Sequence, residues 1–251
     1  MEIIAHRGAS HDAPENTLAA VNLAWQQGAD AVEVDVHLSR DQQIMVIHDD
    51  NTRKTAGLRR KVAAQTLAEL KALDAGTWKG RQWRGEKIPL LTEVLEALPD
   101  GKRLFIEVKC GTGFVDAFEK IRPLWEGKSK RLVLIGFSLE LMQAAKERFP
   151  EVEVCWIVEF KRSLRTGRWT PRREEVLKEA LQAGLDGLDT GAKGPLTDAW
   201  LCATAQAGLS YYVWTVDKPE LAQRLFQIGV NGVTTNRPGW LREQLRLARK
   251  S

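Results

Sequence analysis

Two acidic residues stand two positions apart in the segment EVDV, at Glu33 and Asp35, and a third acid, Glu107, lies near the end of the apolar run LFIEV. In an extended strand, the side chains of Glu33 and Asp35 leave the same face. Carboxylates buried together repel each other, and a hard divalent cation is the usual compensation. Oxygen ligands favour Mg²⁺, Ca²⁺ or Mn²⁺ over zinc. The three acids are therefore the candidate metal ligands. For an isolated pair of acids, an ion-pair network with Arg7 and Lys109 is the alternative.

Two of the four histidines, His6 and His48, end strand-like segments. Imidazoles that titrate near neutral pH can divide the roles of general acid and general base between them. The sequence therefore predicts that His6 and His48 form a catalytic pair. We expect His11, in a loop, and His37, on the outer face of a hairpin, to make only local hydrogen bonds.

Fixed positive charge is expected beside these groups from Arg7 and Lys109, and the guanidinium fork of arginine suits a phosphate group. Acid/base histidines, a hard metal and anion-binding cations together match phosphate ester cleavage. Trp214, at the end of the run YYVW, could fill the core, and its position also allows it to form an apolar wall against a small polyol.

Eight short apolar runs alternate with helical periodicity, which predicts repeated βα units. The strands are expected at 2–5, 30–36, 104–109, 131–136, 152–157, 185–188, 210–215 and 230–234. The helices are expected at 17–27, 90–97, 114–126, 139–148, 173–182, 197–207, 218–228 and 239–248. This count predicts a TIM (β/α)₈ barrel, in which strand ends from distant segments converge at one face. The alternative is an open doubly wound sheet, but no GxGxxG motif follows the first strand.

The apolar segment IMVIHD, at 44–49, follows the second strand too closely for a parallel crossover, so we expect it to return as an antiparallel hairpin arm. With a turn centred on Arg40-Asp41, Asp35 would face Val46 and Glu33 would face His48. Residues 51–89 then form a small cap-like insertion with a short helix near 66–72. We expect residues 1–251 to form a single barrel domain.

The first strand is followed by the loop motif HRGASHDAPENT. Gly8 is expected where the chain leaves the strand sharply. Asn16 and Thr17 are expected mainly to cap the first helix, with Glu15 nearby and a contact between Asn16 and the site as a secondary hypothesis.

The composition is that of an ordinary globular protein, with 43% hydrophobic and 28% charged residues and a net charge of +4. Basic residues gather at 53–61, 161–173 and 237–250, but these runs lack interleaved aromatics, so we expect exposed surfaces and no nucleic-acid partner.

No run of apolar residues is long enough to span a membrane. Three widely spaced cysteines predict reduced thiols, and the absence of a signal-like N-terminus predicts a cytoplasmic protein.

The motifs in this order resemble the glycerophosphodiester phosphodiesterase family. The matching text is HRGASHDAPENT, GADAVEVDVHLSRDQQIMVIHDD, GEKIPLLTEVL, LFIEVK, YYVWTVDKP and GVTTNRP. The resemblance implies a TIM barrel with a small insertion after the HD motif. It also implies that His6 and His48 are catalytic, that Glu33, Asp35 and Glu107 hold one divalent metal ion, and that Arg7 and Lys109 contact phosphate.

The activity implied by the resemblance is hydrolysis of small glycerophosphodiesters, such as glycerophosphocholine or glycerophosphoethanolamine, to glycerol 3-phosphate and an alcohol. Two positions depart from the family pattern: Gly136 stands where serine is common, and Asn236 where aspartate is common. The alternatives are a related barrel phospholipase acting on lysolipids and a non-catalytic barrel that binds a phosphoester.

Overall fold

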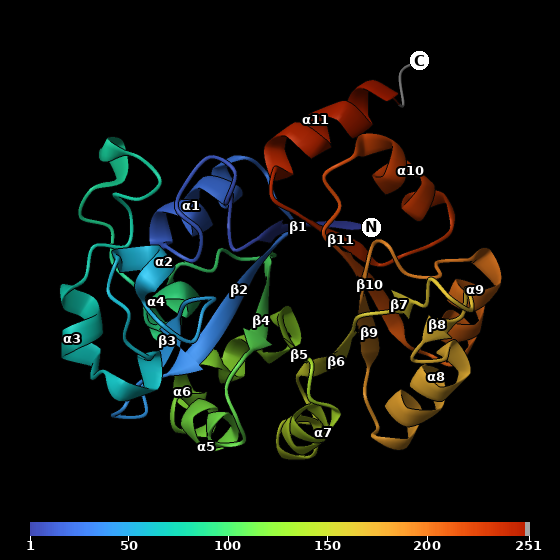
Figure 1. Ribbon diagram of the computed structural model, residues 1–251, viewed down its shortest axis with the longest axis horizontal. Helices are drawn as coiled ribbons and strands as arrows, with labels where there is room; N and C mark the ends of the chain where they lie inside the picture. Colours follow the sequence, from blue (N-terminus) through green and yellow to red (C-terminus); the bar gives the residue numbers. More distant parts are fainter. Residues whose placement is uncertain (249–251) are drawn as a thin grey trace.

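Eight parallel strands form a closed barrel surrounded by helices in the computed structural model, which describes residues 1–248 (Figure 1). The barrel strands are β1 (Glu2–His6), β2 (Ala31–Leu38), β4 (Arg103–Val108), β5 (Leu132–Gly136), β6 (Glu153–Val158), β9 (Gly187–Gly191), β10 (Ser210–Trp214) and β11 (Gly232–Thr235). Because β1 pairs with both β2 and β11, the ring has no open edge. The predicted TIM barrel is confirmed, and the open-sheet alternative is wrong.

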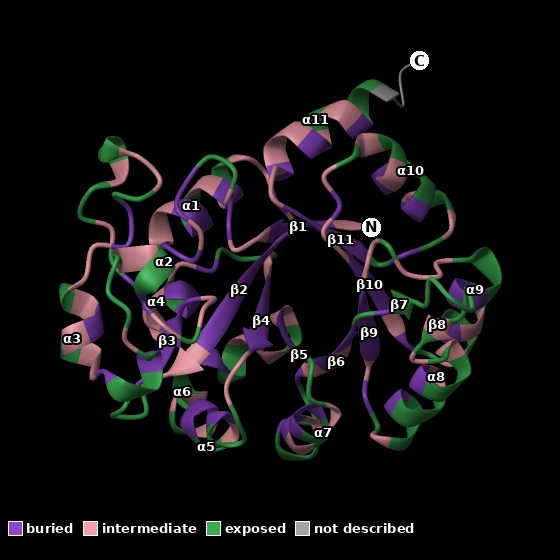
Figure 2. Cartoon of the chain, in the orientation of Figure 1, coloured by how far each residue is buried: buried purple, intermediate pink, exposed green. Residues whose placement is uncertain are grey.

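The β2 strand shows why the sequence favours this arrangement. Val32, Val34 and Val36 are fully buried in the apolar layer between the strands and the helices. Glu33 and Asp35 alternate with them and therefore face the barrel interior. Figure 2 shows the strands as the buried inner ring, while the helices expose their outer faces.

The surrounding helices are α1 (Leu18–Gln26), α4 (Leu91–Glu96), α5 (Gly113–Lys120), α6 (Arg122–Trp125), α7 (Leu139–Arg148), α8 (Arg173–Gln182), α9 (Asp198–Gln206), α10 (Pro219–Gln227) and α11 (Pro238–Ala248). The single helix expected at 114–126 is wrong, since the chain breaks at Ile121 between α5 and α6. Pro123 explains the break, because its ring lacks an N–H and would clash with the carbonyl group of Glu119 in a continuous helix.

The amino end of the barrel is closed by side chains. Phe105 and Tyr212 pack edge to face in the interior, with ring centroids 4.9 Å apart. Closer to the amino ends of the strands, Arg103 donates hydrogen bonds to Glu2 (2.7 Å) and to Glu153. The free space of the barrel therefore lies at its carboxyl end, where the candidate residues were expected.

The second strand returns as a hairpin through β3 (Ile44–Val46), but the predicted register is wrong by one residue. Val36 lies opposite Val46, and the backbone N–H of Ile47 donates to the carbonyl oxygen of Asp35 at 2.9 Å. The cause is the loop at 39–43: Gln42 has a φ of 59°, and the hydroxyl oxygen of Ser39 accepts from the backbone of Gln43. The loop contains an odd number of residues, so the turn is centred on the single residue Asp41 and not on the pair Arg40-Asp41.

The segment after the hairpin contains α2 (Arg53–Ala56), η1 (Val62–Ala64), α3 (Leu67–Ala72) and η2 (Arg81–Trp83). The α3 helix confirms the short helix expected near 66–72. Its side chains join a small core that lies next to β3, formed by Met45, Ile47, Val62, Leu70, Ala75 and Ile88. The segment also reaches the loop after β1, where Lys79 Nζ donates to the carbonyl oxygen of Ser10 at 2.7 Å. The insertion is thus anchored beside the first strand.

A short hairpin that the sequence did not predict, β7 (Lys161–Arg162) and β8 (Trp169–Thr170), follows β6. The basic run 161–173 lies largely on it, and its residues are mostly exposed, as expected of a solvated surface. The last residues of the basic run 237–250, from 249 on, lie outside the described residues. No helix within residues 1–248 is long and apolar enough to cross a membrane.

Candidate active site

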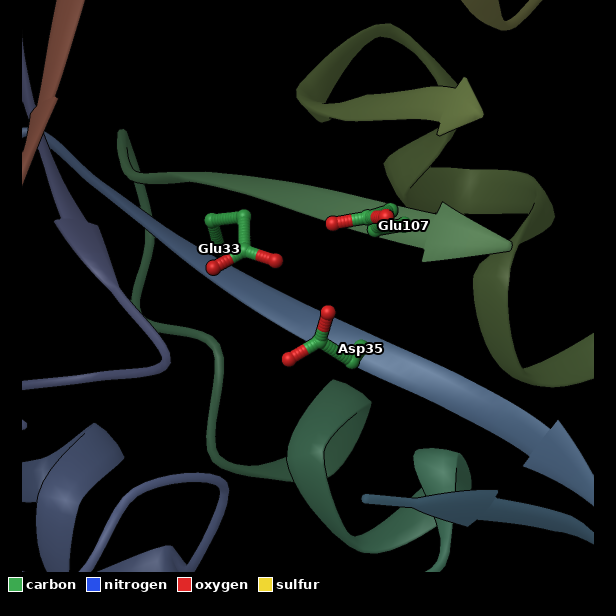
Figure 3. A group of neighbouring side chains, drawn as sticks. All are labelled: Glu33, Asp35 and Glu107. Carbon is green, nitrogen blue, oxygen red and sulfur yellow. The ribbon is translucent and has the colours of Figure 1, made fainter. Parts of the chain in front are cut away.

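Three carboxyl groups meet at the carboxyl end of the barrel (Figure 3). Glu33 and Asp35 extend from β2, and Glu107 extends from β4, where it is the register partner of Asp35. One carboxylate oxygen of each lies within 4.8 Å of the others. All three side chains are buried, and Glu33 Oε1 and Asp35 Oδ1 have no hydrogen-bond partner among the described residues. The candidate metal ligands are therefore brought together, with oxygens free to accept a cation.

Two cations border the acids but do not balance them. Arg7 Nε lies 3.1 Å from Asp35 Oδ2. Lys109 Nζ lies 2.5 Å from Glu107 Oε1 and 3.4 Å from Asp35 Oδ1. Three carboxylates against these two cations leave one negative charge, and burial makes such an excess costly. The cluster therefore has both the donor atoms and the charge to bind a divalent cation.

The pKa values follow from this crowding. Burial, followed by the charge of Asp35, raises the pKa of Glu33 well above its ordinary value. The same two causes raise the pKa of Glu107 to about 7. Burial also acts to raise the pKa of Asp35, but Arg7 and Lys109 outweigh it and hold this pKa below its usual value. Protons thus compete with a metal ion mainly at the two glutamates.

His6 ends β1 and is held by an amide. Its Nδ1 lies 2.7 Å from Asn236 Oδ1, while Asn236 Nδ2 donates to Asp217 Oδ2 at 2.7 Å. Because the amide nitrogen is directed to Asp217, the oxygen is the atom that faces His6, so Nδ1 carries the hydrogen. Neutral His6 therefore has its free lone pair on Nε2. Burial and then Arg7 lower the pKa of His6, which favours this neutral form.

His48 is held by a carboxylate instead. Its Nδ1 lies 2.7 Å from Asp49 Oδ1, and its backbone carbonyl oxygen lies 3.1 Å from His37 Nε2. Asp49 therefore orients the His48 ring as Asn236 orients His6, but with a negative charge. The contact of the His37 ring is local, as expected. The exposed His11 ring lies 3.9 Å from Asp12, but the His11 backbone N–H donates to the carbonyl oxygen of the distant Asn236 at 3.1 Å, so the expectation of only local hydrogen bonds is wrong for His11.

The loop after β1 supports the acids through unusual backbone geometry. Arg7 and Asn16 have φ values of 57° and 58°. Gly8 has a φ of 77°, and a Cβ there would lie 2.5 Å from the Ala20 backbone, which confirms the sharp exit from the strand. The Arg7 backbone N–H donates to Glu33 Oε2 at 2.8 Å, so this bend also holds a candidate ligand.

The roles expected of Asn16 and Thr17 separate in the structure. Thr17 caps α1 by accepting from the backbone of Ala20, as predicted. Asn16 is no cap: its Nδ2 donates to Asp35 Oδ2 at 2.8 Å, and its Oδ1 accepts from the Asp35 backbone at 3.1 Å. The secondary hypothesis for Asn16 is therefore the correct one. Glu15 accepts from Arg7 at 2.9 Å and from Lys54 of the insertion.

A cavity of about 380 Å³ opens between these groups and the opposite barrel wall. The first wall carries the predicted residues His6, Arg7, Glu33, His48, Glu107 and Lys109. The second wall carries Ile135, Phe137, Ile157, Glu159, Asp189, Trp214, Thr215 and Thr234. Trp214 lies edge-on to Phe137, with centroids 6.2 Å apart. All the predicted site residues except Asp35 thus line one cavity, and Asp35 lies buried beneath it.

Sequence reasoning missed Asp189, Asn236, Asp217 and Phe137. Asp189 is only 2% exposed, and burial, followed by the charge of Glu107, raises its pKa well above the ordinary value. The strand expected at 185–188 actually runs from 187 to 191, which places Asp189 within β9 and not beyond its end. A carboxyl group inside an apolar strand was the available signal. The partnership of Asn236 with His6 joins residues 230 positions apart and left no local signal.

Known proteins resemble this chain over nearly its whole length. Residues 6–240 match the sequence profile described as the "Glycerophosphoryl diester phosphodiesterase family". A glycerophosphodiester phosphodiesterase of Caldanaerobacter subterraneus subsp. tengcongensis is 32% identical over 94% of both chains. A human lysophospholipase D is 25% identical over 96% of this chain and 85% of its own. An Oleispira antarctica phosphodiesterase, solved in complex with the product sn-glycerol-3-phosphate, is 29% identical with a TM-score of 0.84, covering 98% of this chain and 97% of its own.

Proposed function

The chain belongs to the glycerophosphoryl diester phosphodiesterase family, and we propose that it hydrolyses small glycerophosphodiesters, such as glycerophosphocholine or glycerophosphoethanolamine, to sn-glycerol 3-phosphate and an alcohol. The observation that carries this proposal is one cavity lined by two oriented histidines, two cations and two acids, Glu33 and Glu107, which cluster with the buried Asp35. The proposal treats residues 1–251 as one catalytic domain with residues 51–89 as a cap, working in the cytoplasm.

We propose Glu33, Asp35 and Glu107 as the ligands of one divalent cation, Mg²⁺ or Ca²⁺, with Mn²⁺ as a further candidate. Two observations support a hard cation: the donor set is all oxygen, and Glu33 Oε1 and Asp35 Oδ1 accept no hydrogen bond from the described residues. When bound, such an ion stabilises negative charge on the phosphate oxygens. We propose that Arg7, which follows β1, and Lys109, which follows β4, each bind a phosphate oxygen from their own side of this cluster.

The two histidines are proposed to divide proton transfer between them. His6 is the better first base, because its Nδ1 hydrogen is held by a neutral amide, its Nε2 is free and its pKa is lowered. His48 would then be the acid that protonates the leaving alcohol from Nε2, while Asp49 holds its ring. A base and an acid from separate strands allow proton removal and proton delivery on different sides of one phosphorus atom.

The first step we propose is attack of the glycerol 2-hydroxyl oxygen on phosphorus. The new O–P bond forms as the bond to the other alcohol breaks, His6 takes the hydroxyl proton, and His48 gives a proton to the leaving oxygen. Water then opens the cyclic phosphate with the roles of the histidines reversed. A substrate without the 2-hydroxyl should turn over poorly, and normal turnover of such an analogue would rule out this route.

The experiment that tests the proposed substrate class measures release of glycerol 3-phosphate from purified protein with a divalent cation. Glycerophosphocholine and glycerophosphoethanolamine are compared with lysophosphatidylcholine. Faster cleavage of the deacylated diesters is expected, since the exposed residues of the cap are mainly basic and polar, with Leu58 and Trp78 as its exposed large apolar side chains. Faster cleavage of lysophosphatidylcholine would favour the lysolipid alternative instead. Cleavage of none of them would favour a barrel that only binds phosphoesters.

A further inference from the structure

The second wall of the cavity contains two buried polar atoms that the chain itself does not satisfy. Asp189 Oδ1 on β9 and Trp214 Nε1 on β10 have no hydrogen-bond partner within residues 1–248. Both residues line the cavity. Buried polar atoms without partners are uncommon because each costs the protein its lost hydration. Because both atoms lie on neighbouring strands of one cavity, a ligand bound in that cavity could supply the missing partner.

The positions of these atoms relate them to the substrate. Around the ring of eight strands, β9 is four places from β2 and three from β4 (Figure 1). Asp189, within β9, therefore extends from the wall opposite the strand of Glu33 and Asp35. On the adjacent strand, Tyr212 is the register partner of Asp189, and Trp214 follows two residues later on the same face. A phosphodiester bound at the acids and histidines would direct one of its alcohols across the cavity to this pair.

The chemistry of the pair selects the group that it can bind. A carboxyl oxygen accepts a hydrogen bond, and an indole N–H only donates one. A hydroxyl group satisfies both at once, because it donates and accepts. An ammonium group could satisfy Asp189 but has no lone pair for Trp214. The surrounding Ile135 and Ile157 would contact the carbon atoms beside such a hydroxyl.

We propose that Asp189 and Trp214 form a subsite that binds a free hydroxyl group of the substrate, the terminal hydroxyl of the glycerol unit. This subsite rests on the proposed function, and it assigns Trp214 a polar role in addition to that of an apolar wall. It also gives a reason for a buried carboxyl group that forms no ion pair with any cation between residues 1 and 248. The subsite would hold the glycerol unit by the hydroxyl that does not attack phosphorus.

The test compares two ligands by calorimetry on the metal-loaded protein, glycerol 3-phosphate and 2-hydroxypropyl phosphate, which lacks only the terminal hydroxyl. The wild type should bind glycerol 3-phosphate about tenfold more tightly, as expected for one or two hydrogen bonds. Asp189→Leu should abolish this preference, and Asp189→Asn should retain most of it, because an amide oxygen still accepts. Trp214→Phe, which keeps the ring and removes the donor, should reduce the preference.

Stability separates this role from a structural one. Without ligand, Asp189→Leu should melt at a higher temperature than the wild type, because an unpartnered buried carboxyl group is removed. Asp186→Asn is the matched control: Asp186 precedes the same strand but accepts from the Val154 backbone and pairs with Lys146. It should lower the melting temperature and leave the ligand preference unchanged.

Three results would overturn the subsite. The first is an unchanged preference in Asp189→Leu, and the second is a destabilised Asp189→Leu variant whose two affinities fall equally. The third is a lower ratio, in both Asp189 variants than in the wild type, of kcat/KM for glycerophosphoethanolamine to kcat/KM for glycerophosphoglycerol, which would assign the carboxylate to a cationic head group. If the wild type cleaves no glycerophosphodiester, the proposed function fails, but the two-ligand binding comparison still tests the subsite independently.

Discussion

The contact between His6 and Asn236 makes a prediction about pH. The perturbation is the double variant Asp217→Asn/Asn236→Asp. It exchanges the acid and the amide in the hydrogen-bonded series Asp217–Asn236–His6. In the wild type Asn236 Nδ2 donates to Asp217; in the double variant the amide at 217 can donate to the carboxylate at 236, which reverses this bond but keeps it. His6 Nδ1 then faces a carboxylate instead of an amide oxygen. The exchange moves the negative charge from position 217 to position 236, next to His6. Asn236→Asp alone would instead bring two carboxylates together, since Asp217 Oδ2 lies 2.7 Å from Asn236 Nδ2.

The size of the effect follows from the distances. In the wild type, burial and then Arg7 lower the pKa of His6, so the acidic limb of kcat/KM should lie below 6.5, the ordinary value for histidine. A carboxylate 2.7 Å from Nδ1, the separation now occupied by the amide oxygen, stabilises the imidazolium. An opposite charge this close raises a pKa by about 1 to 3 units. We expect the acidic limb to move up by about 1 to 2 units, because a base with a raised pKa loses its proton only at higher pH.

The assay is kcat/KM for one glycerophosphodiester across the acidic and neutral range, with Asn236→Ala as the control. That variant removes the support of His6 without adding charge, so kcat should fall with no upward movement of the acidic limb. The divalent cation is kept saturating across the profile, because the pKa of Glu107 is itself raised to about 7 and proton competition at this acid would otherwise shape the same limb. Under that condition, an acidic limb above 6.5 in the wild type, or an unchanged limb in the double variant, would refute the assignment of His6 as the first base.

Two further predictions concern the acids and their support. A divalent cation at about 100 times its Kd should stabilise the EDTA-treated protein by about 2.7 kcal/mol and raise its melting temperature by about 5 to 11 °C. Glu33→Gln should lose most of this shift, whereas Glu159→Gln at the cavity mouth should keep it, and equal shifts in both variants would contradict the ligand set. Asn16→Ala should lower the free energy of unfolding, measured in urea, by about 3 kcal/mol, because two buried hydrogen bonds to Asp35 are lost and alanine is strained at positive φ. Asn16→Gly relieves the strain but not the lost bonds, so it should fall between the wild type and Asn16→Ala, and a variant as stable as the wild type would show that Asn16 does not support Asp35.

Local patterns were sufficient for much of the fold. The run EVDV alternates valines, which pack against helices, with acids that face the interior, and a strand period of two makes that alternation visible in the sequence. Helices such as α7 and α8 were predicted at their observed bounds, because apolar periodicity marks each helix and Pro150 and Gly184 mark where they end.

The hairpin register and the β9 bounds were not predictable in the same way. Whether the turn at 39–43 centres on one residue or two depends on Gln42 adopting positive φ and on the hydroxyl group of Ser39, and neither has a strong sequence signal. The difference between the expected and observed bounds of β9 affected the functional interpretation. Because the strand was expected to end before Asp189, this residue was not considered as part of the site.

The candidate site divides in a similar way. The sequence was sufficient to predict that the acids and histidines at strand ends lie together, because a parallel barrel brings the carboxyl ends of all its strands to one face. The groups that orient them could not, since Asn16 reaches Asp35 and Asn236 reaches His6 only through the closed ring. Asn16 also looks like a helix cap in the sequence, and only its position in the fold assigns it to the acids.

The most direct test of the central claim is the rate of glycerol 3-phosphate release from glycerophosphocholine by EDTA-treated protein, before and after a divalent cation is restored. The same measurement is made on His6→Ala and His48→Ala. We expect no release in EDTA, recovery with Mg²⁺, Ca²⁺ or Mn²⁺, and a loss of about 10² to 10⁴ in each histidine variant. Full activity in EDTA, or in either variant, would contradict the account.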